Sequence, residues 1–435
     1  MILADRYNYP EIFHKKSMGA LESALNTAPA YSAWRSLDPG IKAPLDMRYD
    51  SLPELTKQMM REFFPNGLVP NYRDIEDGLS SDEIEYTFTS GTTGERVINI
   101  WDQNWWDRSE AASWKLNENT NKLEYPQKEA KLASSLNVGI SCEEDLPMEY
   151  RIVGQKLYLN EKINIIQWQP RHYMRMAREL RTFQPVILEA NPSLLARLAY
   201  WAIDNGTELY SPPAIVFTYE LPSQIHLAVI RKAFSSSALV SSYGTTETGF
   251  VMEECEKGLL HQNIDFRRID FCPLKEKHGG PELGTILVST FGNPWNSVIK
   301  FDVGDLIRLH HSGRCDCGRD RGMIVQGIEG RTANLTFTTD GRIVTTQDLD
   351  RALSQIQGIR DYHLEQNSEK EYELQLMQDN DARGVIGASR SALESIYGRD
   401  GEFDIKILKN ILPGSAGKFR RTQANFDFDM EGLFI

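Results

Sequence analysis

The chain has 435 residues, of which 41% are hydrophobic, 10% aromatic and 25% charged. This balance is typical of globular proteins and excludes a disordered or collagen-like chain. The 48 Lys and Arg residues against 61 Asp and Glu residues give a net charge of −13, so we expect no nucleic-acid partner and no polybasic attachment to a membrane.

Length and residue order narrow the expectation further. At about 150 residues per domain, two or three domains are predicted. Charged residues begin at Asp5, directly after a short apolar start, so no secretion signal is expected, and no run reaches the ~18 apolar residues of a membrane-spanning helix. We therefore expect a cytoplasmic protein. Five cysteines, at 142, 255, 272, 315 and 317, do not form a disulfide framework, which leaves burial or metal ligation.

The first three quarters of the chain predict an α/β domain. Short helical stretches with proline-containing turns extend to about residue 80, and we expect them to serve packing. From about 84 to 330, β-rich runs alternate with helical ones, which indicates a sheet covered by helices. The predicted strands are Ile84–Thr89, Val186–Leu188, Ile215–Phe217, Ala238–Ser241 and Thr285–Ser289, and the clearest helices are Arg171–Phe183 and Pro192–Ile203.

After Arg331 the pattern predicts a small α+β domain. Asp340-Gly341 lies between two short strand-like runs and indicates a hairpin turn. Leu349, Leu353 and Ile356 recur as on one face of a helix. The remaining predicted elements are strands at Tyr362–Gln366, Tyr372–Met377 and Phe403–Ile407, with a helix from about Ala382 to Tyr397.

One segment has the composition of an anion cradle. A predicted strand leads into Thr89–Gly94, where every residue is Ser, Thr or Gly, so backbone N–H groups and hydroxyls are offered with little bulk. The Gly-Lys-Ser/Thr of a Walker loop does not follow. On composition alone, a surface loop is an equal alternative.

A second segment, Ser241–Gly249, combines an aromatic ring with a hydroxyl and a carboxylate. Tyr243 precedes a glycine and can lie flat against a base, while Thr246 and Glu247 suit a Mg²⁺ ion that is also held by phosphate. The alternative is a strand-ending turn with an exposed Glu247.

Three shorter signals follow. Asp305 after Gly304 can accept two hydrogen bonds from a ribose diol, although Gly-Asp is usually a turn. Gly330-Arg331 lies at the boundary of the small domain. Lys418 lies in the glycine-containing stretch 412–421, where a lysine is by default solvated.

In this order, the five segments resemble the signatures of the adenylate-forming superfamily of acyl-CoA synthetases, peptide-synthetase adenylation domains and luciferases. Thr89–Arg96 is similar to its Thr-Ser-Gly-Thr-Thr-Gly-x-Pro-Lys, Tyr243–Glu247 to its Tyr-Gly-x-Thr-Glu, Gly304-Asp305 to its Thr-Gly-Asp, Gly330-Arg331 to the Gly-Arg before its hinge, and Gly417-Lys418 to the Gly-Lys of its C-terminal loop. Ala190–Leu195 and Cys-x-Cys-Gly-Arg at 315–319 most resemble the phenylacetate-CoA ligase and CapK branch.

The resemblance implies an α/β fold with an ATP- and acid-binding domain at 1–330, a hinge at 331–334 and a mobile C-terminal α+β domain at 335–435. It implies that a carboxylic acid attacks the α-phosphorus of ATP, which gives an acyl-adenylate and pyrophosphate, and that a second nucleophile then takes the acyl group. Catalysis would rest on positioning and on cations that absorb charge.

Roles follow residue by residue from the resemblance. Lys418 would bridge the carboxylate and the α-phosphate, Thr246 would contact the α-phosphate, and Glu247 would hold Mg²⁺. The implied ATP-binding residues are Thr89, Ser90, Gly91, Thr92, Thr93, Gly94, Arg96, Tyr219, Glu220, Ser242, Tyr243, Gly244, Thr245, Asp305 and Arg331.

A metal-like set accompanies these residues. Cys255, His261, Cys315 and Cys317 supply three thiolates and one imidazole, which suits a closed structural Zn²⁺ site. Some members of the phenylacetate-CoA ligase-like branch carry such a site in this region. The alternatives are that His261 is a surface histidine, or that the nitrogen comes from His310 or His311.

The sequence departs from the family pattern at three places. Glu95-Arg96 replaces Pro-Lys, which keeps a positive charge but changes its shape. Thr332-Ala-Asn carries no Asp or Lys at the expected hinge, although Ala333-Asn334 can absorb a rotation. Thr336–Arg342 replaces the Gly-rich segment of CoA users, so CoA, a carrier-protein thiol and an amine all stay open as acyl acceptors.

The sequence says least about the identity of the carboxylic acid substrate. The predicted pocket draws on Trp101, Trp105, Trp106, Ser134–Gly139 and Phe217–Glu220. Aromatic neighbours favour an aryl or unsaturated acid, although closely spaced tryptophans are more often core. Monomer and homodimer are both open.

One alternative belongs to another function class: a nucleotide-binding homologue without turnover that acts as a scaffold. Retention of Glu247, Asp305 and Lys418 on separate segments favours the active enzyme.

Overall fold

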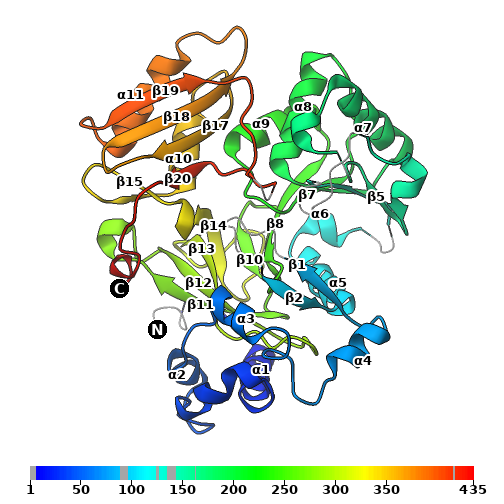
Figure 1. Ribbon diagram of the computed structural model, residues 1–435, viewed down its shortest axis with the longest axis vertical. Coiled ribbons are helices and arrows are strands. Elements are labelled where there is room, and N and C mark those ends of the chain that lie inside the picture. The colour runs from blue at the N-terminus through cyan, green and yellow to red at the C-terminus, as the bar shows by residue number, and fades with distance from the viewer. Residues whose placement is uncertain (1–5, 89–96, 124–126, 135–143, 162, 415–416) are drawn as a thin grey trace.

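A sheet that changes from parallel to antiparallel pairing organises the fold (Figure 1). The computed structural model describes residues 6–88, 97–123, 127–134, 144–161, 163–414 and 417–435. Within this part of the chain, the sheet has twelve strands, in the spatial order β11 (Arg267–Pro273), β12 (Leu283–Thr290), β13 (Phe301–Leu309), β14 (Ile324–Arg331), β10 (Leu260–Gln262), β9 (Gly249–Glu254), β8 (Ala238–Thr245), β7 (Ala214–Phe217), β6 (Ile187–Ala190), β3 (Glu129–Leu132), β5 (Lys156–Tyr158) and β4 (Ile152–Val153).

Strand β8 is the place where the pairing changes. Its first half, Ala238–Ser241, pairs in parallel with β7, whereas Ser242–Thr245 pairs antiparallel with β9. Ligands of α/β sheets bind beyond the carboxyl ends of the parallel strands. Thr246 and Glu247 follow that end of β8 directly, so the topology favours a binding site there.

Helices α7 (Pro170–Phe183) and α8 (Pro192–Asp204) cover one face of the parallel half. The apolar residues of this layer include Ala130, Leu132, Leu188, Ala190 and Ile215 on the strands and Leu180, Leu194, Leu195 and Leu198 on the helices. The side chain of Asn191 caps α8 by accepting a hydrogen bond from the Leu194 N–H at 3.1 Å, and Pro192 fits the first turn because its missing N–H is not needed there. Helix α9 (Gln224–Ala233) follows β7 and packs beside α8.

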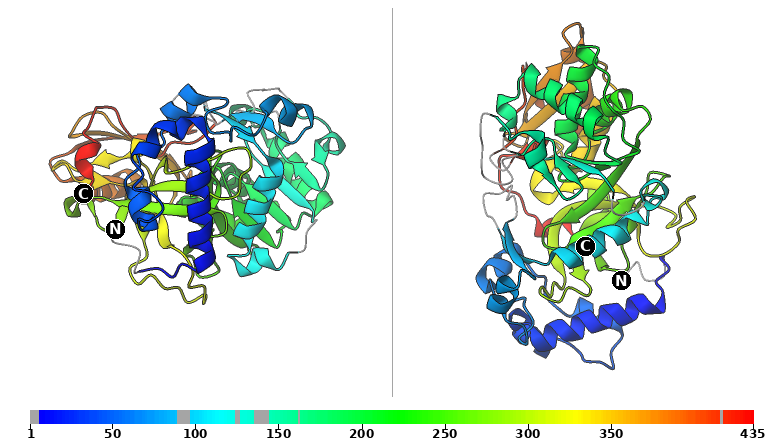
Figure 2. Two further views of the ribbon diagram at one scale, coloured as in Figure 1. Left: turned by 90° about the horizontal axis from the view of Figure 1, so that it is seen from below. Right: turned by 90° about the vertical axis from the view of Figure 1, so that its right-hand side faces the viewer.

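The N-terminal segments pack against the antiparallel half, as expected. Helix α1 (Glu11–Thr27) contributes Leu21 and Leu25 to a core that also holds Val251 and Val288 of the sheet. Figures 1 and 2 show α1 at the opposite end of the molecule from the C-terminal sheet. The shorter helices are α2 (Leu45–Asp50), α3 (Lys57–Phe63), α4 (Ile75–Ser80) and α6 (Glu118–Asn121), while α5 (Gln103–Trp114) packs on β9 and follows the hairpin of β1 (Glu85–Phe88) and β2 (Ile98–Trp101).

Residues after Arg331 form a second, four-stranded sheet. Its order is β19 (Glu402–Ile407), β18 (Glu371–Gln378), β17 (Ile359–Gln366) and β20 (Thr422–Ala424), and helices α10 (Thr346–Leu353) and α11 (Val385–Tyr397) pack on it. The predicted hairpin at Asp340-Gly341 joins β15 (Thr336–Phe337) to β16 (Ile343–Val344). Contacts between α9 and β17 and between α10 and β14 place this sheet against the large one.

The segment after β20 returns to the large sheet. The backbone of Lys275 donates to the carbonyl of Leu433 at 2.9 Å, and Leu274 pairs with Phe434. Leu433 shares an apolar cluster with Leu335 and Phe337, which directly follow the predicted hinge. The chain is therefore held to the large part both before and after the small sheet.

The expected elements are confirmed to within a few residues, except that helix α10 ends at Leu353, so Ile356 lies beyond it. Strands without a counterpart among the predicted elements include β3, β5, β9, β10, β11, β13, β14 and β20. None of the described helices is long and apolar enough to cross a bilayer. The domain boundaries, the cytoplasmic location and the monomer or homodimer state stay predictions.

Candidate active site

A cavity of about 770 Å³ lies between the carboxyl ends of the central strands and the C-terminal loop. It brings together segments that are far apart in sequence. The predicted site residues that line it are Tyr219, Glu220, Ser242, Tyr243, Gly244, Thr245, Thr246, Glu247, Asp305, Arg331 and Lys418. Thr89, Ser90, Gly91, Thr92, Thr93, Gly94 and Arg96 lie outside the described residues.

The end of β8 forms the middle of the cavity wall. Gly244 is required there, because a Cβ atom would come within 2.4 Å of the Gly249 carbonyl oxygen on β9. Glu247 is only 6% exposed, and among the described residues its carboxylate makes no hydrogen bond or ion pair. Since buried carboxylates are normally paired, the arrangement suits a cationic ligand, and Thr246 beside it adds a hydroxyl.

Asp305, on strand β13 of the antiparallel half of the sheet, contacts both Tyr243 and Arg331. The Tyr243 hydroxyl donates to Asp305 Oδ2 at 2.8 Å, and Arg331 Nε lies 3.3 Å from Asp305 Oδ1. Burial and the neighbouring Asp305 raise the pKa of Tyr243 well above its usual range, so its hydroxyl keeps the proton that it donates. Asp305, which lines the cavity, is thereby held at both of its carboxylate oxygens.

Lys418 enters the same cavity from the C-terminal loop. Burial and Arg331 lower the pKa of Lys418, while the carboxylates of Glu220, Asp305 and Glu247 oppose that shift. Its ammonium makes no hydrogen bond or ion pair with any residue that the structure describes. A cation that faces carboxylates without contacting them is suited to an anionic ligand placed between them.

Glu220 holds this loop in place. Its Oε1 accepts from the Phe419 N–H at 2.6 Å and its Oε2 accepts from the Ser193 hydroxyl at 2.8 Å. Arg421 continues the contact, because its guanidinium donates to Asp361 at 2.8 Å and to His226 Nδ1 at 3.1 Å. Glu220 therefore anchors the residue after Lys418, and its predicted contact with the nucleotide stays a prediction.

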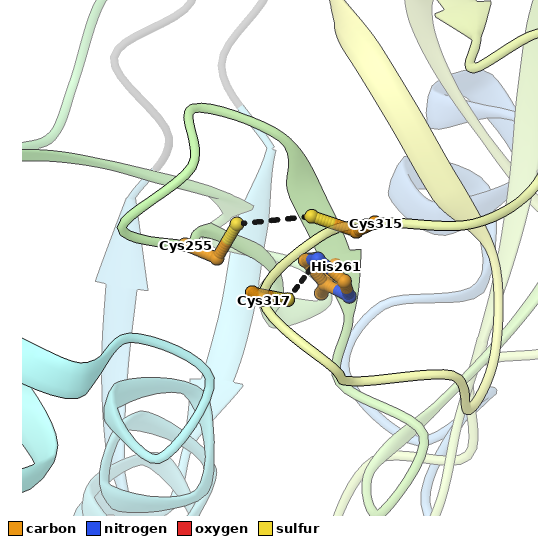
Figure 3. Close-up of side chains that lie close together, drawn as sticks. All are labelled: Cys255, His261, Cys315 and Cys317. Carbon is orange, nitrogen blue, oxygen red and sulfur yellow. Dashed lines mark hydrogen bonds between the residues drawn. The ribbon is translucent and has the colours of Figure 1, made fainter.

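The metal-like set is gathered in one place (Figure 3). One potential ligand atom from each of Cys255, His261, Cys315 and Cys317 lies within 4.8 Å of all the others. Cys255 Sγ and Cys315 Sγ are 3.6 Å apart, which is too far for a disulfide and near the ~3.8 Å that tetrahedral sulfurs with 2.3 Å zinc bonds would show.

His261 belongs to this set. It is fully buried, its Nε2 lies 3.4 Å from Cys317 Sγ, and its Nδ1 has no hydrogen-bond partner among the described residues. The alternative that it is a surface histidine is wrong. His310 and His311 pack against each other with tilted rings, 4.4 Å between centroids, and are not part of the group.

The tryptophans divide between core and cavity. Trp105 is 3% exposed, its indole N–H donates to the Phe291 carbonyl, and Arg267 stacks on it, so it is a core residue and not a pocket residue. Trp101 and Trp106 line the cavity with their ring centroids 4.0 Å apart.

The sequence interpretation missed a set of charged cavity residues. Glu110, Lys131, Lys156 and Glu189 also line the cavity. No predicted strand contains them: Lys131 and Lys156 lie on β3 and β5, which have no counterpart among the predicted strands, Glu189 directly follows the predicted strand Val186–Leu188, and Glu110 lies on helix α5.

Comparison with known proteins gives a partial match in sequence and a nearly complete one in structure. No family model matches the chain. Protein CapK of Staphylococcus aureus is 22% identical over 247 residues, which is 56% of this chain and 54% of CapK, so the match spans about half the length of that relative.

Solved structures resemble the whole chain. 2-Hydroxyisobutyryl-CoA ligase in the postadenylation state, with an acyl-AMP, superposes with a TM-score of 0.71 at 15% identity and covers 98% of this chain and 94% of its own. The fold is that of the acid-CoA ligases. The same enzyme in the thioesterification state gives 0.56 at 17% identity with coverage of 98% and 94%, and the anthranilate CoA ligase AuaEII gives 0.52 at 13% with 77% and 65%. The predicted adenylate-forming α/β fold is confirmed.

Proposed function

We propose that this chain is an ATP-dependent ligase that converts a small carboxylic acid to an acyl-adenylate and pyrophosphate, and then passes the acyl group to a nucleophile. The observation that carries the proposal is the convergence of Asp305, Glu247 and Lys418 on one cavity from three separate segments. Ligases with this fold have been captured with acyl-AMP, which supports the same chemistry here.

Asp305 and Lys418 have different proposed roles because they carry opposite charges. Asp305, fixed by Tyr243 and Arg331, would accept hydrogen bonds from the ribose diol. Lys418, protonated, would lie between the attacking carboxylate and the α-phosphate, where it offsets the repulsion of two anions and stabilises the charge that develops in the transition state. The acid oxygen forms a bond to the α-phosphorus as the bond to pyrophosphate breaks.

The remaining phosphate contacts follow from the resemblance. Thr246 would donate to the α-phosphate, and Thr89–Arg96 would contact the β- and γ-phosphates. A Mg²⁺ ion held by Glu247 would neutralise part of the phosphate charge. The carboxylate of Glu247 has the chemistry for this role, since it faces the cavity and none of the described residues pairs with it.

We also propose that Cys255, His261, Cys315 and Cys317 hold a structural Zn²⁺. Four ligands complete a tetrahedral site and leave no open position for a substrate. Backbone N–H groups of Lys257 and Arg319 lie 3.4 and 3.5 Å from Cys255 Sγ and Cys317 Sγ, an outer arrangement that stabilises thiolates.

The second step would follow a rotation at 331–334. The higher TM-score against the postadenylation form than against the thioesterification form, 0.71 against 0.56, supports a C-terminal region placed for the first step. CoA, a carrier-protein thiol and an amine are all acceptors that the chemistry allows.

ATP–pyrophosphate exchange across a panel of acids tests the proposal. We expect acid-dependent exchange in the wild type and a loss of about 10²-fold or more in Lys418→Ala, with ATP binding retained. The exposed Lys409 on the approach to the loop gives the matched control, Lys409→Ala, which should behave as wild type. ATP binding without exchange for any acid would instead support the homologue without turnover.

A further inference from the structure

The cavity face of the parallel strands is charged, in contrast to their other face. Strands of a parallel sheet are normally apolar on both faces, and the residues that face α7 and α8 follow this rule. Toward the cavity, Tyr158, Lys131 and Glu189 lie side by side on β5, β3 and β6, with Lys156 and Glu129 paired one row below. Such a floor is built for a polar ligand, since burying unused charges is costly.

The lysines of this floor are already paired. Lys131 Nζ lies 3.2 Å from Glu189 Oε2, and Lys156 Nζ lies 3.0 Å from Glu129 Oε2. Thr218 also donates to Glu189 Oε1 at 3.0 Å. The two lysines and the two glutamates of the floor therefore neutralise each other, and the floor has no unpaired lysine that could bind an anionic ligand.

Helix α5 adds an acidic and aromatic wall. Gln103, Trp106, Asp107 and Glu110 all line the cavity, and their spacing places them on one face of the helix. Trp106 packs on Trp101 and meets the edge of Phe250. Aromatic faces beside carboxylates attract cations.

Glu110 is the group of this wall that lacks a partner. Among the described residues it makes no hydrogen bond and no ion pair. Burial and the neighbouring Glu189 raise the pKa of Glu110 to about 8, although Lys156 and Lys131 oppose the shift. Both lysines are already paired with other carboxylates. A bound cation would let this carboxyl ionise and would complete the pairing.

The order of the strands indicates which end of the substrate would lie over the charged floor. In the sheet, β13 and β14 carry Asp305 and Arg331, β8 with Thr246 beyond it lies in the middle, and β6, β3 and β5 lie on the far side. An acid with its carboxylate at Lys418 and Thr246 therefore extends away from the ribose side, over the charged floor.

Resting on the proposed function, we infer that the acid carries a second, cationic group, so that an amine-bearing acid is the substrate class and its ammonium binds Glu110 beside Trp106. This differs from the aryl or unsaturated acid that the tryptophans alone favoured. Those rings line one wall only, and the sheet beneath them is charged.

Exchange measurements with matched acids test this inference. The panel pairs glycine, β-alanine and 4-aminobutyrate with acetate, propionate and butyrate, and adds succinate, glutarate and benzoate. We expect the best amine-bearing acid to exceed its partner at least ~10-fold in kcat/KM, and Glu110→Gln to raise its KM about 10–100-fold, as expected for the loss of a charge-assisted contact. The KM for ATP should not change, and Glu118→Gln on the exposed α6 should match wild type. A preference for dicarboxylic or benzoic acids overturns the inference while leaving adenylation intact.

A binding measurement separates this inference from the proposed function. Calorimetric titration of wild type and Glu110→Gln with the same acids, with ATP present, does not require turnover. Amine-bearing acids that bind the wild type and not the variant support the inference even if no exchange occurs. The inference is refuted if wild type and Glu110→Gln bind the amine-bearing acids equally. It is also refuted if the wild type binds none of these acids while it catalyses exchange with other acids.

Discussion

Replacement of Glu220 by Gln isolates the contact that holds the loop after Lys418. The wild-type carboxylate accepts from the Phe419 N–H at 2.6 Å and from the Ser193 hydroxyl at 2.8 Å. A glutamine keeps the shape and one acceptor but loses the charge. Hydrogen bonds to charged groups contribute about 1.5–3 kcal/mol and neutral ones about 0.5–1.5 kcal/mol, so the change should cost about 1–1.5 kcal/mol.

That cost should appear as fewer molecules with Lys418 in position. At about 1.4 kcal/mol per factor of ten, kcat/KM for ATP–pyrophosphate exchange should fall roughly 5–10-fold. Glu220 also opposes the burial that lowers the pKa of Lys418. Its neutralisation should lower that pKa further, and since the lysine acts in its protonated form, the alkaline limb of the pH–rate profile should move to lower pH.

Ser193→Ala is the matched control, because it removes the other partner of Glu220 and keeps the carboxylate charge. We expect a smaller loss of rate and an unmoved alkaline limb. A Glu220→Gln enzyme with wild-type rate and pH profile would refute the argument. Loss of ATP binding in that variant would show instead that Glu220 acts on the nucleotide and not through the loop.

Two further changes test other parts of the structure. Metal analysis should find about one zinc per chain. The Cys317→Ser variant should lose the zinc together with several degrees of thermal stability, whereas the control Cys272→Ser, outside the cluster, should keep both. Wild-type protein without zinc would contradict the site. Glu253 is fully buried, and burial raises its pKa to about 8. The folded state therefore keeps a proton that the unfolded carboxyl loses above its ordinary pKa of about 4.5. As a result, the free energy of unfolding should fall between roughly pH 4.5 and 8, by up to about 4–5 kcal/mol. Glu253→Gln should flatten this part of a denaturant-based pH–stability curve, and an unchanged curve would show that the carboxyl is ionised in the core.

The predictable elements are those whose own residues decide them. Helix α8 has Asn191 and Pro192 at its start and an apolar face, and β7 is four buried apolar residues, so local pattern suffices. Strand β20 is Thr-Gln-Ala and exists because the exposed edge of β17 accepts it. No local signal could have predicted a pairing that tertiary structure supplies.

The site divides in the same way. Tyr243, Asp305 and Lys418 were found because each belongs to a recognisable motif. The anchoring role of Glu220 depends on the position of Phe419, about 200 residues away, and the charged floor depends on the parallel register that places Lys131 beside Glu189. Both are properties of pairing between distant segments, which a single sequence does not display.

The return of the C-terminal segment to the large sheet constrains any motion of the small one. A sheet joined to its neighbour at one point can swivel in every direction, whereas one joined at two points can turn only about the line between them. Leu335, just after the proposed hinge, and Leu433, near the end of the chain, share one apolar cluster, so the two attachments adjoin. A rotation at 331–334 therefore has to open this cluster, whereas a rotation that keeps it closed has to bend the chain after Leu335 and again after β20.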